Sequence, residues 1–176
     1  MKQSIVRLLS TSLVLVTIAP AQRANKRENQ TMSETEKNVQ VMLEIFHLIE
    51  TRDPNNQANA QRGLELFQPD VEFHWPPSLP YGGSYGLQTT KTPTWGETWT
   101  PLQPTEAERR MDPRVIGGNG NEVVILWRQR GVSPNGERCD SEVLGFYRLR
   151  DGKLARAQMF YFDPVSVATF LQRATK

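Results

Sequence analysis

The sequence has very little cysteine and histidine. Among its 176 residues, Cys139 is the one cysteine, and His47 and His74 are the two histidines. A lone cysteine excludes a disulfide within the chain, and so few thiol and imidazole groups leave almost no ligands for a zinc site. We therefore expect no metal ion in this fold.

Motifs that identify a reaction or a cofactor are also absent. The sequence contains no H-E-x-x-H, no phosphate-binding loop, and no G-x-G-x-x-G that follows a strand and opens a helix. Any chemistry must therefore come from scattered polar side chains, and we expect no bound cofactor.

The main part of the chain lacks an excess of positive charge. Residues 1–31 hold five of the 21 basic side chains and one of the 19 acidic ones, which leaves 16 basic and 18 acidic residues downstream, a net charge of −2. The sequence pI of 8.8 is therefore due to the N-terminal segment. A domain of this charge without a basic cluster is not expected to bind nucleic acid.

No hydrophobic run is long enough to anchor the chain in a membrane. The apolar run over residues 8–18 is about half the roughly 20 residues that a membrane-spanning helix needs. Basic residues precede it and Ala-Pro-Ala at 19–21 follows it, which is the layout of a secretory signal. We interpret residues 1–21 as a signal peptide and 22–35 as a linker, so that the protein would be exported to the periplasm or secreted. The alternative is translation from Met32 and a cytoplasmic protein.

The remainder has the pattern of one α+β domain. Ser33-x-x-Glu36 has the form of a capping box and predicts the start of a helix. In the second helix, Leu64 and Phe67 are expected to face inward. Hairpin turns such as Asn-Gly and Asp-Gly separate the later strands, which predicts a curved antiparallel sheet with the helices on one face. The predicted elements are helices over 33–51 and 56–67, a strand over 71–75, a loop with a short helix over 76–104, strands near 108–116, 122–131, 138–150 and 153–162, and a helix over 164–176.

Two residues are candidates for acid–base catalysis. His74 lies in a strand beside Phe73 and Trp75, where an imidazole close to the apolar interior would stay neutral, as a general base must be. The alternative is a structural histidine that is bonded to a backbone carbonyl or exposed at the rim of the sheet. Asp163 follows three aromatic residues and could act as an acid or base, or it could cap the helix that begins at Pro164, which its sequence position favours.

Aromatic side chains are numerous enough to line a pocket for a small apolar molecule, although such residues are more often simply core. Alternation in the strand over 122–131 places Trp127 and Gln129 on one face with Val123 and Ile125. Glu142 is a candidate for the pocket, and the alternative is that it forms an ion pair with Arg128 on the adjacent strand. The expected ligand-binding residues are Trp75, Tyr81, Tyr85, Trp127, Glu142 and Phe160.

Three segments resemble the SnoaL-like branch of the nuclear transport factor 2-like superfamily. They are Phe73-His74-Trp75-Pro76, the Pro-Tyr-Gly-Gly-Ser-Tyr-Gly segment at 80–86, and the Asp-Gly-Lys hairpin at 151–153 that leads to Tyr161-Phe162-Asp163-Pro164. The resemblance covers about residues 36–173. It implies a cone-shaped curved sheet with helices on its concave face, a cavity between them, and a homodimer formed through the outer face of the sheet.

The resemblance also implies a range of functions, because the superfamily includes polyketide cyclases, ketosteroid isomerases and proteins that only bind ligands. It places His74 and Asp163 at the edge of the cavity. We therefore expect a protein that binds a small apolar molecule and acts as a cofactor-free lyase, isomerase or cyclase. His74 would be the base, Asp163 the acid, and Tyr81 or Tyr85 the donor to an oxyanion. The alternative is a non-catalytic ligand-binding or dimerisation module of the same fold.

Overall fold

The computed structural model describes residues 32–53, 56–88, 99 and 101–174. The signal peptide predicted over residues 1–21 and most of the linker after it lie outside the described residues. Within these ranges, no helix has both the length and the apolar character that crossing a membrane requires.

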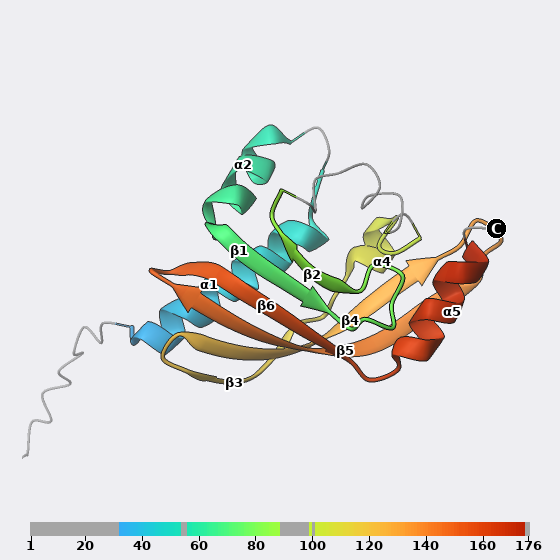
Figure 1. Ribbon diagram of the computed structural model, residues 1–176. Helices are drawn as coiled ribbons and strands as arrows, with labels where there is room; N and C mark the ends of the chain where they lie inside the picture. Colours follow the sequence, from blue (N-terminus) through green and yellow to red (C-terminus); the bar gives the residue numbers. More distant parts are fainter. Residues whose placement is uncertain (1–31, 54–55, 89–98, 100, 175–176) are drawn as a thin grey trace, which may run out of the picture. The chain divides into compact units, whose positions relative to one another are not determined.

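One curved, open sheet of six strands forms the centre of the domain, in the order β2-β1-β6-β5-β4-β3 (Figure 1). The four later strands form a meander, as the Asn-Gly and Asp-Gly turns predicted. The strands are β1 (Phe67–Trp75), β2 (Gly83–Gly86), β3 (Arg114–Asn119), β4 (Glu122–Val132), β5 (Arg138–Arg150) and β6 (Lys153–Tyr161).

The sheet is not antiparallel throughout. Strand β1 pairs with β6 in parallel, with Phe73 opposite Ala157 and His74 opposite Gln158. The other pairs are antiparallel, including β1 with the short strand β2, which the sequence did not predict. The first and last strands of the domain are therefore neighbours, a long-range pairing that no local turn signal could indicate.

Helix α1 (Glu34–Glu50) begins at the predicted capping box. The Ser33 hydroxyl accepts a hydrogen bond from the Glu36 amide at 3.2 Å, and the Glu36 carboxylate accepts one from the Ser33 amide at 2.7 Å. Met42, Ile45 and Phe46 are buried on the face of α1 that packs against the sheet. The Phe46 ring lies 6.0 Å from the rings of both Trp127 and Tyr147, so α1 lies over β4 and β5.

Two predicted elements differ from the structure. Residues 106–109 form the short helix α4 (Glu106–Arg109) instead of the start of a strand, and β3 begins only at Arg114. Thr105 lies at the N-cap position of this helix, where its hydroxyl donates a hydrogen bond to the Glu108 carboxylate and no side chain caps the backbone.

Helix α2 (Gln57–Glu65) is shorter than predicted, since Phe67 already belongs to β1. Leu64 was expected to face inward, but it is 39 % exposed and the neighbouring Leu66 is buried instead. The chain ends in α5 (Pro164–Ala174), which lies at the opposite end of the sheet from the start of α1 (Figure 1).

The register separates the two faces of the sheet. One row across β4, β5, β6 and β1 contains Val123, Tyr147, Ala157 and Phe73, and the next contains Val124, Phe146, Gln158 and His74. Side chains of the first row face the helices. Those of the second row point to the other side, because side chains alternate between faces along a strand.

Candidate functional site

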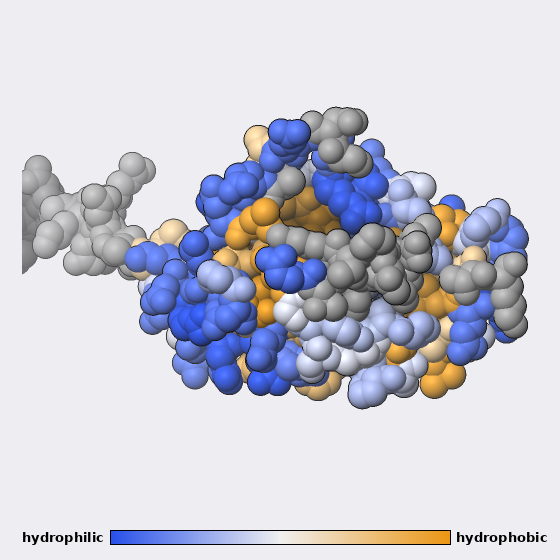
Figure 2. All heavy atoms as spheres, turned by 45° about the horizontal axis from the view of Figure 1, so that its top comes forward, coloured by the Kyte–Doolittle hydropathy of each residue, from blue (hydrophilic) through white to orange (hydrophobic). Residues whose placement is uncertain are grey.

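A pocket of about 770 Å³ lies between α1 and the inner face of the sheet. This volume is within the range of small-molecule sites, roughly 300–1,000 Å³. Figure 2 shows the hollow, where hydrophobic side chains gather between hydrophilic ones. Its lining residues include Met42, Ile45, Phe46, Phe67, Phe73, Trp75, Leu87, Leu102, Met111, Trp127, Tyr147, Ala157 and Met159.

Aromatic rings form a large part of the wall. Phe73 and Trp75 lie two residues apart on β1, and their rings are stacked at 5.7 Å with an angle of 20° between their planes. Trp127 faces them from β4, in contact with the edge of Phe46. Flat rings offer a large contact area with little conformational freedom, which suits an apolar ligand.

A few polar groups interrupt this apolar wall. Gln129 is fully buried, and its side-chain oxygen accepts a hydrogen bond from the Tyr161 hydroxyl at 3.3 Å. The indole nitrogen of Trp127 is buried near the Tyr147 hydroxyl and forms no hydrogen bond of standard geometry with the described residues. Burial raises the pKa of Tyr147, so its hydroxyl stays protonated. The pocket therefore offers buried hydrogen-bond donors to an acceptor oxygen.

The pocket includes two of the predicted ligand-binding residues, Trp75 and Trp127. Tyr81 and Tyr85 lie beside Trp75, with ring centres 6.2 Å and 6.1 Å away, and are not among the described lining residues. The Tyr81 hydroxyl donates to that of Tyr161 at 3.0 Å, and the Tyr85 hydroxyl donates to the Gly82 carbonyl at 2.6 Å. Both tyrosines thus pack against the pocket residue Trp75.

The candidate base His74 does not reach the pocket. Its Nδ1 lies 2.7 Å from the Ser84 hydroxyl and its Nε2 lies 3.1 Å from a carboxylate oxygen of Glu72. All three side chains belong to the outer face of the sheet, because neighbouring Phe73 and Trp75 point inward. The structure therefore places the imidazole away from the pocket, between two side chains of the outer face.

Glu142 and Phe160 also lie on the outer face. Glu142 is 3.6 Å from Arg128 on the adjacent strand, which is the cross-strand pair that was the alternative reading of the sequence. Phe160 is 51 % exposed. Neither residue lines the pocket, since both are one position out of step with the inward-facing residues of their strands.

Asp163 caps α5. Its carboxylate accepts hydrogen bonds from the Ser166 amide at 2.9 Å and from the Ser166 hydroxyl at 2.6 Å. These bonds lower the pKa of Asp163, whereas a catalytic acid would need a raised one. The two catalytic candidates therefore do not meet around the pocket, and both are bound by local partners.

Other reactive groups contribute little to the site. Burial raises the pKa of Cys139 to about 11, so the thiol stays protonated near neutral pH and is a poor nucleophile. His47 is exposed in the last turn of α1. The described residues contain no group of three or more acidic, histidine or cysteine side chains that could hold a metal ion.

The sequence did not single out four polar residues of the pocket wall, which are Arg52, Gln103, Gln129 and Tyr147. Gln129 and Tyr147 could have been found, because strand alternation already placed each of them on an apolar face. Arg52 could not, because it follows the helix end and no local pattern shows which way it points.

The family to which the chain belongs follows from its sequence as well as its fold. The model of the SnoaL-like domain family matches residues 43–157, which is more than half of the chain. The chain belongs to the SnoaL-like domain family. This confirms the resemblance seen in the sequence and agrees with the observed α+β fold. No curated protein matches the chain.

Solved structures share the fold of this SnoaL-like domain at low sequence identity. An NTF2-like protein from Burkholderia xenovorans LB400 is 17 % identical with a TM-score of 0.57, covering 83 % of this chain and 100 % of its own. A proposed polyketide cyclase from Xanthomonas campestris pv. campestris is 16 % identical with a TM-score of 0.56, covering 77 % and 98 %. TerC, co-crystallised with polyporic acid, is 20 % identical with a TM-score of 0.56, covering 77 % and 98 %.

Proposed function

We propose that this SnoaL-like domain binds a small apolar molecule in the pocket between α1 and the sheet. The observation that carries this proposal is an aromatic-lined pocket of about 770 Å³ whose wall includes a buried donor, the Trp127 indole nitrogen, that forms no hydrogen bond of standard geometry with the described residues. A bound acceptor oxygen would satisfy that donor, which otherwise costs free energy. TerC, which has the same fold, was crystallised with a small molecule, polyporic acid, and this supports a ligand-binding role.

A neutral fluorescent probe tests this proposal. N-phenyl-1-naphthylamine is apolar and becomes bright when it leaves water, so a titration of the full chain should show saturable binding. Ala157 is buried on the pocket wall, and Ala157→Leu should weaken binding several-fold by filling the space. Ala155→Leu on the same strand, outside the described lining, is the matched control. Absence of saturable binding, or equal weakening by both variants, would refute the proposal.

Catalysis by His74 and Asp163 has no support from their positions. The described lining residues include no histidine and no carboxylate, so a lyase, isomerase or cyclase reaction in this pocket would have to use other groups. Tyr147, Gln129 and the Trp127 indole can donate hydrogen bonds to a carbonyl, which polarises it but does not remove a proton. Ligand binding is therefore the function that this geometry supports best.

We also propose that two copies of the chain associate through the outer face of the sheet. That face carries an apolar patch on β4, β5 and β6, formed by Val124, Leu126, Leu144, Phe146 and Phe160. Sedimentation velocity should report a dimer, and Phe160→Lys should yield monomers. Val165 on α5 is 70 % exposed, so Val165→Lys adds the same charge away from the patch and should leave the dimer intact. A monomeric wild type would refute this assignment.

A further inference from the structure

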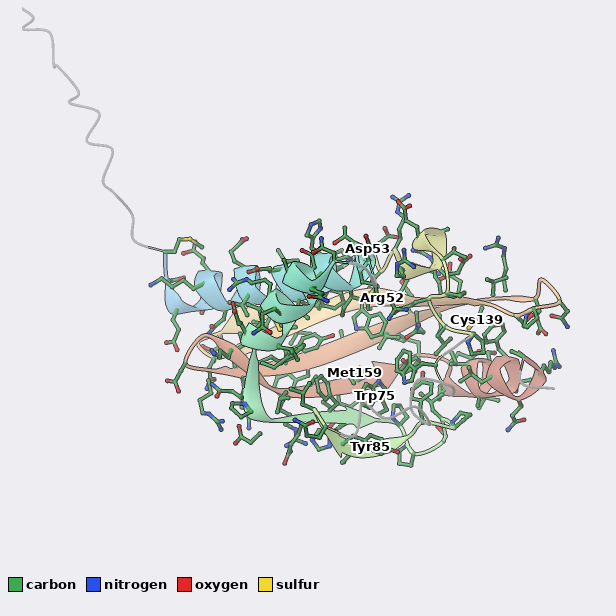
Figure 3. The ribbon with its side chains drawn as sticks, turned by 90° about the horizontal axis from the view of Figure 1, so that it is seen from above. Arg52, Asp53, Trp75, Tyr85, Cys139 and Met159 are labelled. Atoms are coloured by element: carbon green, nitrogen blue, oxygen red, sulfur yellow. The ribbon has the colours of Figure 1, made fainter. Side chains whose placement is uncertain are left out.

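One charged side chain lines the described part of the pocket: Arg52. It follows Thr51, the residue that caps the C-terminal end of α1. Arg52 is exposed as a whole residue and still contributes to the lining, so it lies at the rim of the hollow. In Figure 3, Arg52 lies on the helix side, across from Met159 and Trp75 of the sheet.

This guanidinium lacks a counter-charge within the described residues. Its one hydrogen bond there is a long one, 3.4 Å from Nη2 to the Gln103 carbonyl oxygen. No described carboxylate lies within the 4.0 Å of an ion pair. By contrast, Arg128, Arg138 and Arg148 each have a carboxylate oxygen within 2.8 Å.

The surroundings of Arg52 disfavour an isolated positive charge. Partial burial and the nearby positive charge of Arg109 lower the pKa of Arg52 below its usual value. Even so, a guanidinium remains protonated at any ordinary pH. A negative group brought to the rim would therefore be stabilised by both arginines.

The remaining lining residues indicate what kind of molecule would carry the negative charge that pairs with Arg52. Stacked Phe73 and Trp75 offer an apolar surface opposite α1, while Gln103 and the Trp127 indole are neutral. We propose that the ligand is an apolar molecule with a single carboxylate, whose ring or chain lies against the aromatic wall and whose carboxylate pairs with Arg52. This rests on the proposed function, since it specifies the ligand of the same pocket.

A matched pair of competitors tests the charge preference. Naphthalene-2-carboxylate and its neutral amide, naphthalene-2-carboxamide, have nearly the same shape and can each displace N-phenyl-1-naphthylamine from the full chain. The carboxylate should displace the probe at about tenfold lower concentration, the size expected for a charge-assisted hydrogen bond. This preference should shrink as sodium chloride is added, because Arg52 is accessible to solvent.

Substitutions then assign the preference to one residue. Arg52→Gln should abolish the preference for the carboxylate, taken as the ratio of the concentrations at which the two competitors displace the probe from the same variant, and Arg52→Lys should retain part of it. Arg62→Gln is the matched control, since it removes a positive charge from exposed α2 outside the described lining. It should leave the preference unchanged.

The outcomes separate the two proposals. Saturable probe binding with no preference for the carboxylate in the wild type overturns the inference about Arg52 and leaves the proposed function standing. A preference that Arg52→Gln retains also overturns it. Failure of the probe to bind the wild type overturns both. Circular dichroism would reveal whether Arg52→Gln folds. If it does not, the inference is tested by the preference of the wild type for the carboxylate, by the salt dependence of that preference, and by its partial retention in Arg52→Lys.

Discussion

Tyr147 folds back over Gly145 on the inner face of β5. A Cβ atom placed on Gly145 would clash with the hydroxyl and the ring of Tyr147. Tyr147 in turn lines the pocket and contacts the edge of Phe46 on α1. The absence of a side chain at position 145 therefore fixes the place of one wall of the pocket.

Gly145→Ala should push Tyr147 away from its present site. We expect the free energy of unfolding to fall by about 1–3 kcal/mol, as for overpacking in a close-packed interior, and the affinity for the neutral probe to fall with it. Urea denaturation and probe titration measure the two effects. Gly117→Ala on β3 is the control, because a Cβ there meets nothing within 4 Å. Equal stability of the two variants would contradict the clash.

Loss of the capping box should destabilise α1 without changing its packing face. Ser33→Ala removes the acceptor for the Glu36 amide, and we expect a loss of about 1 kcal/mol in the free energy of unfolding. Ser33→Asp keeps an acceptor at this position, so its free energy of unfolding should stay close to that of the wild type. Denaturation of the three proteins side by side checks this, and a loss of the same size in Ser33→Asp would contradict it.

The ion pair between Glu108 and Arg138 should contribute to stability in a pH-dependent way. Their nearest atoms are 2.6 Å apart, and the side chain of Glu108 is 4 % exposed. The hydrogen bond from Thr105, together with Arg138, lowers the pKa of Glu108 below its ordinary value of 4.5. A lowered pKa in the folded state means that the stabilisation is present above 4.5 and is lost as the pH falls through the folded-state pKa.

Glu108→Gln isolates this contribution. The stability of the wild type should exceed that of the variant at pH 7, and the difference should shrink steadily as the pH is lowered below 4.5. Urea denaturation at a series of pH values measures it. Glu106 is exposed on the same short helix, so Glu106→Gln should follow the wild type throughout. A difference that does not change with pH would rule out this role for the Glu108 charge.

His74→Asn should leave the pocket unaffected. His74 is bonded to Ser84 and Glu72 on the outer face, so we expect the affinity for the neutral probe to change less than about twofold and the stability to fall by roughly 1 kcal/mol or less. Trp75→Leu, one residue along the chain, alters the pocket wall and should lower the affinity for the probe several-fold. If His74→Asn weakened binding as strongly as Trp75→Leu, the assignment of faces would be wrong.

The sequence predicted local features well. The capping box at Ser33, the alternation that brings Gln129 to the face of Trp127, and the hairpins of the meander are all encoded within a few neighbouring residues. The alternation of β1 also predicts the face on which His74 lies, since Glu72 and His74 point to the side opposite Phe73 and Trp75. The catalytic hypothesis gave more weight to apolar neighbours in sequence than to this alternation.

The remaining features depend on contacts between distant segments. The position of Arg52 at the rim is set by where α1 ends relative to the sheet, and the pairing of β1 with β6 joins segments about 85 residues apart. Such pairings are decided by the packing of the whole domain and leave no mark on the local hydrophobic pattern.

The parallel pair formed by β1 and β6 has a consequence for how the domain assembles. On one side β1 pairs only with the four-residue strand β2. Most backbone hydrogen-bonding groups of β1 therefore stay unpaired until β6, near the end of the chain, has been synthesised. High contact order of this kind slows folding. A nascent chain that stops before residue 153 would hold an unpaired, aromatic-rich edge, and such edges attract other chains.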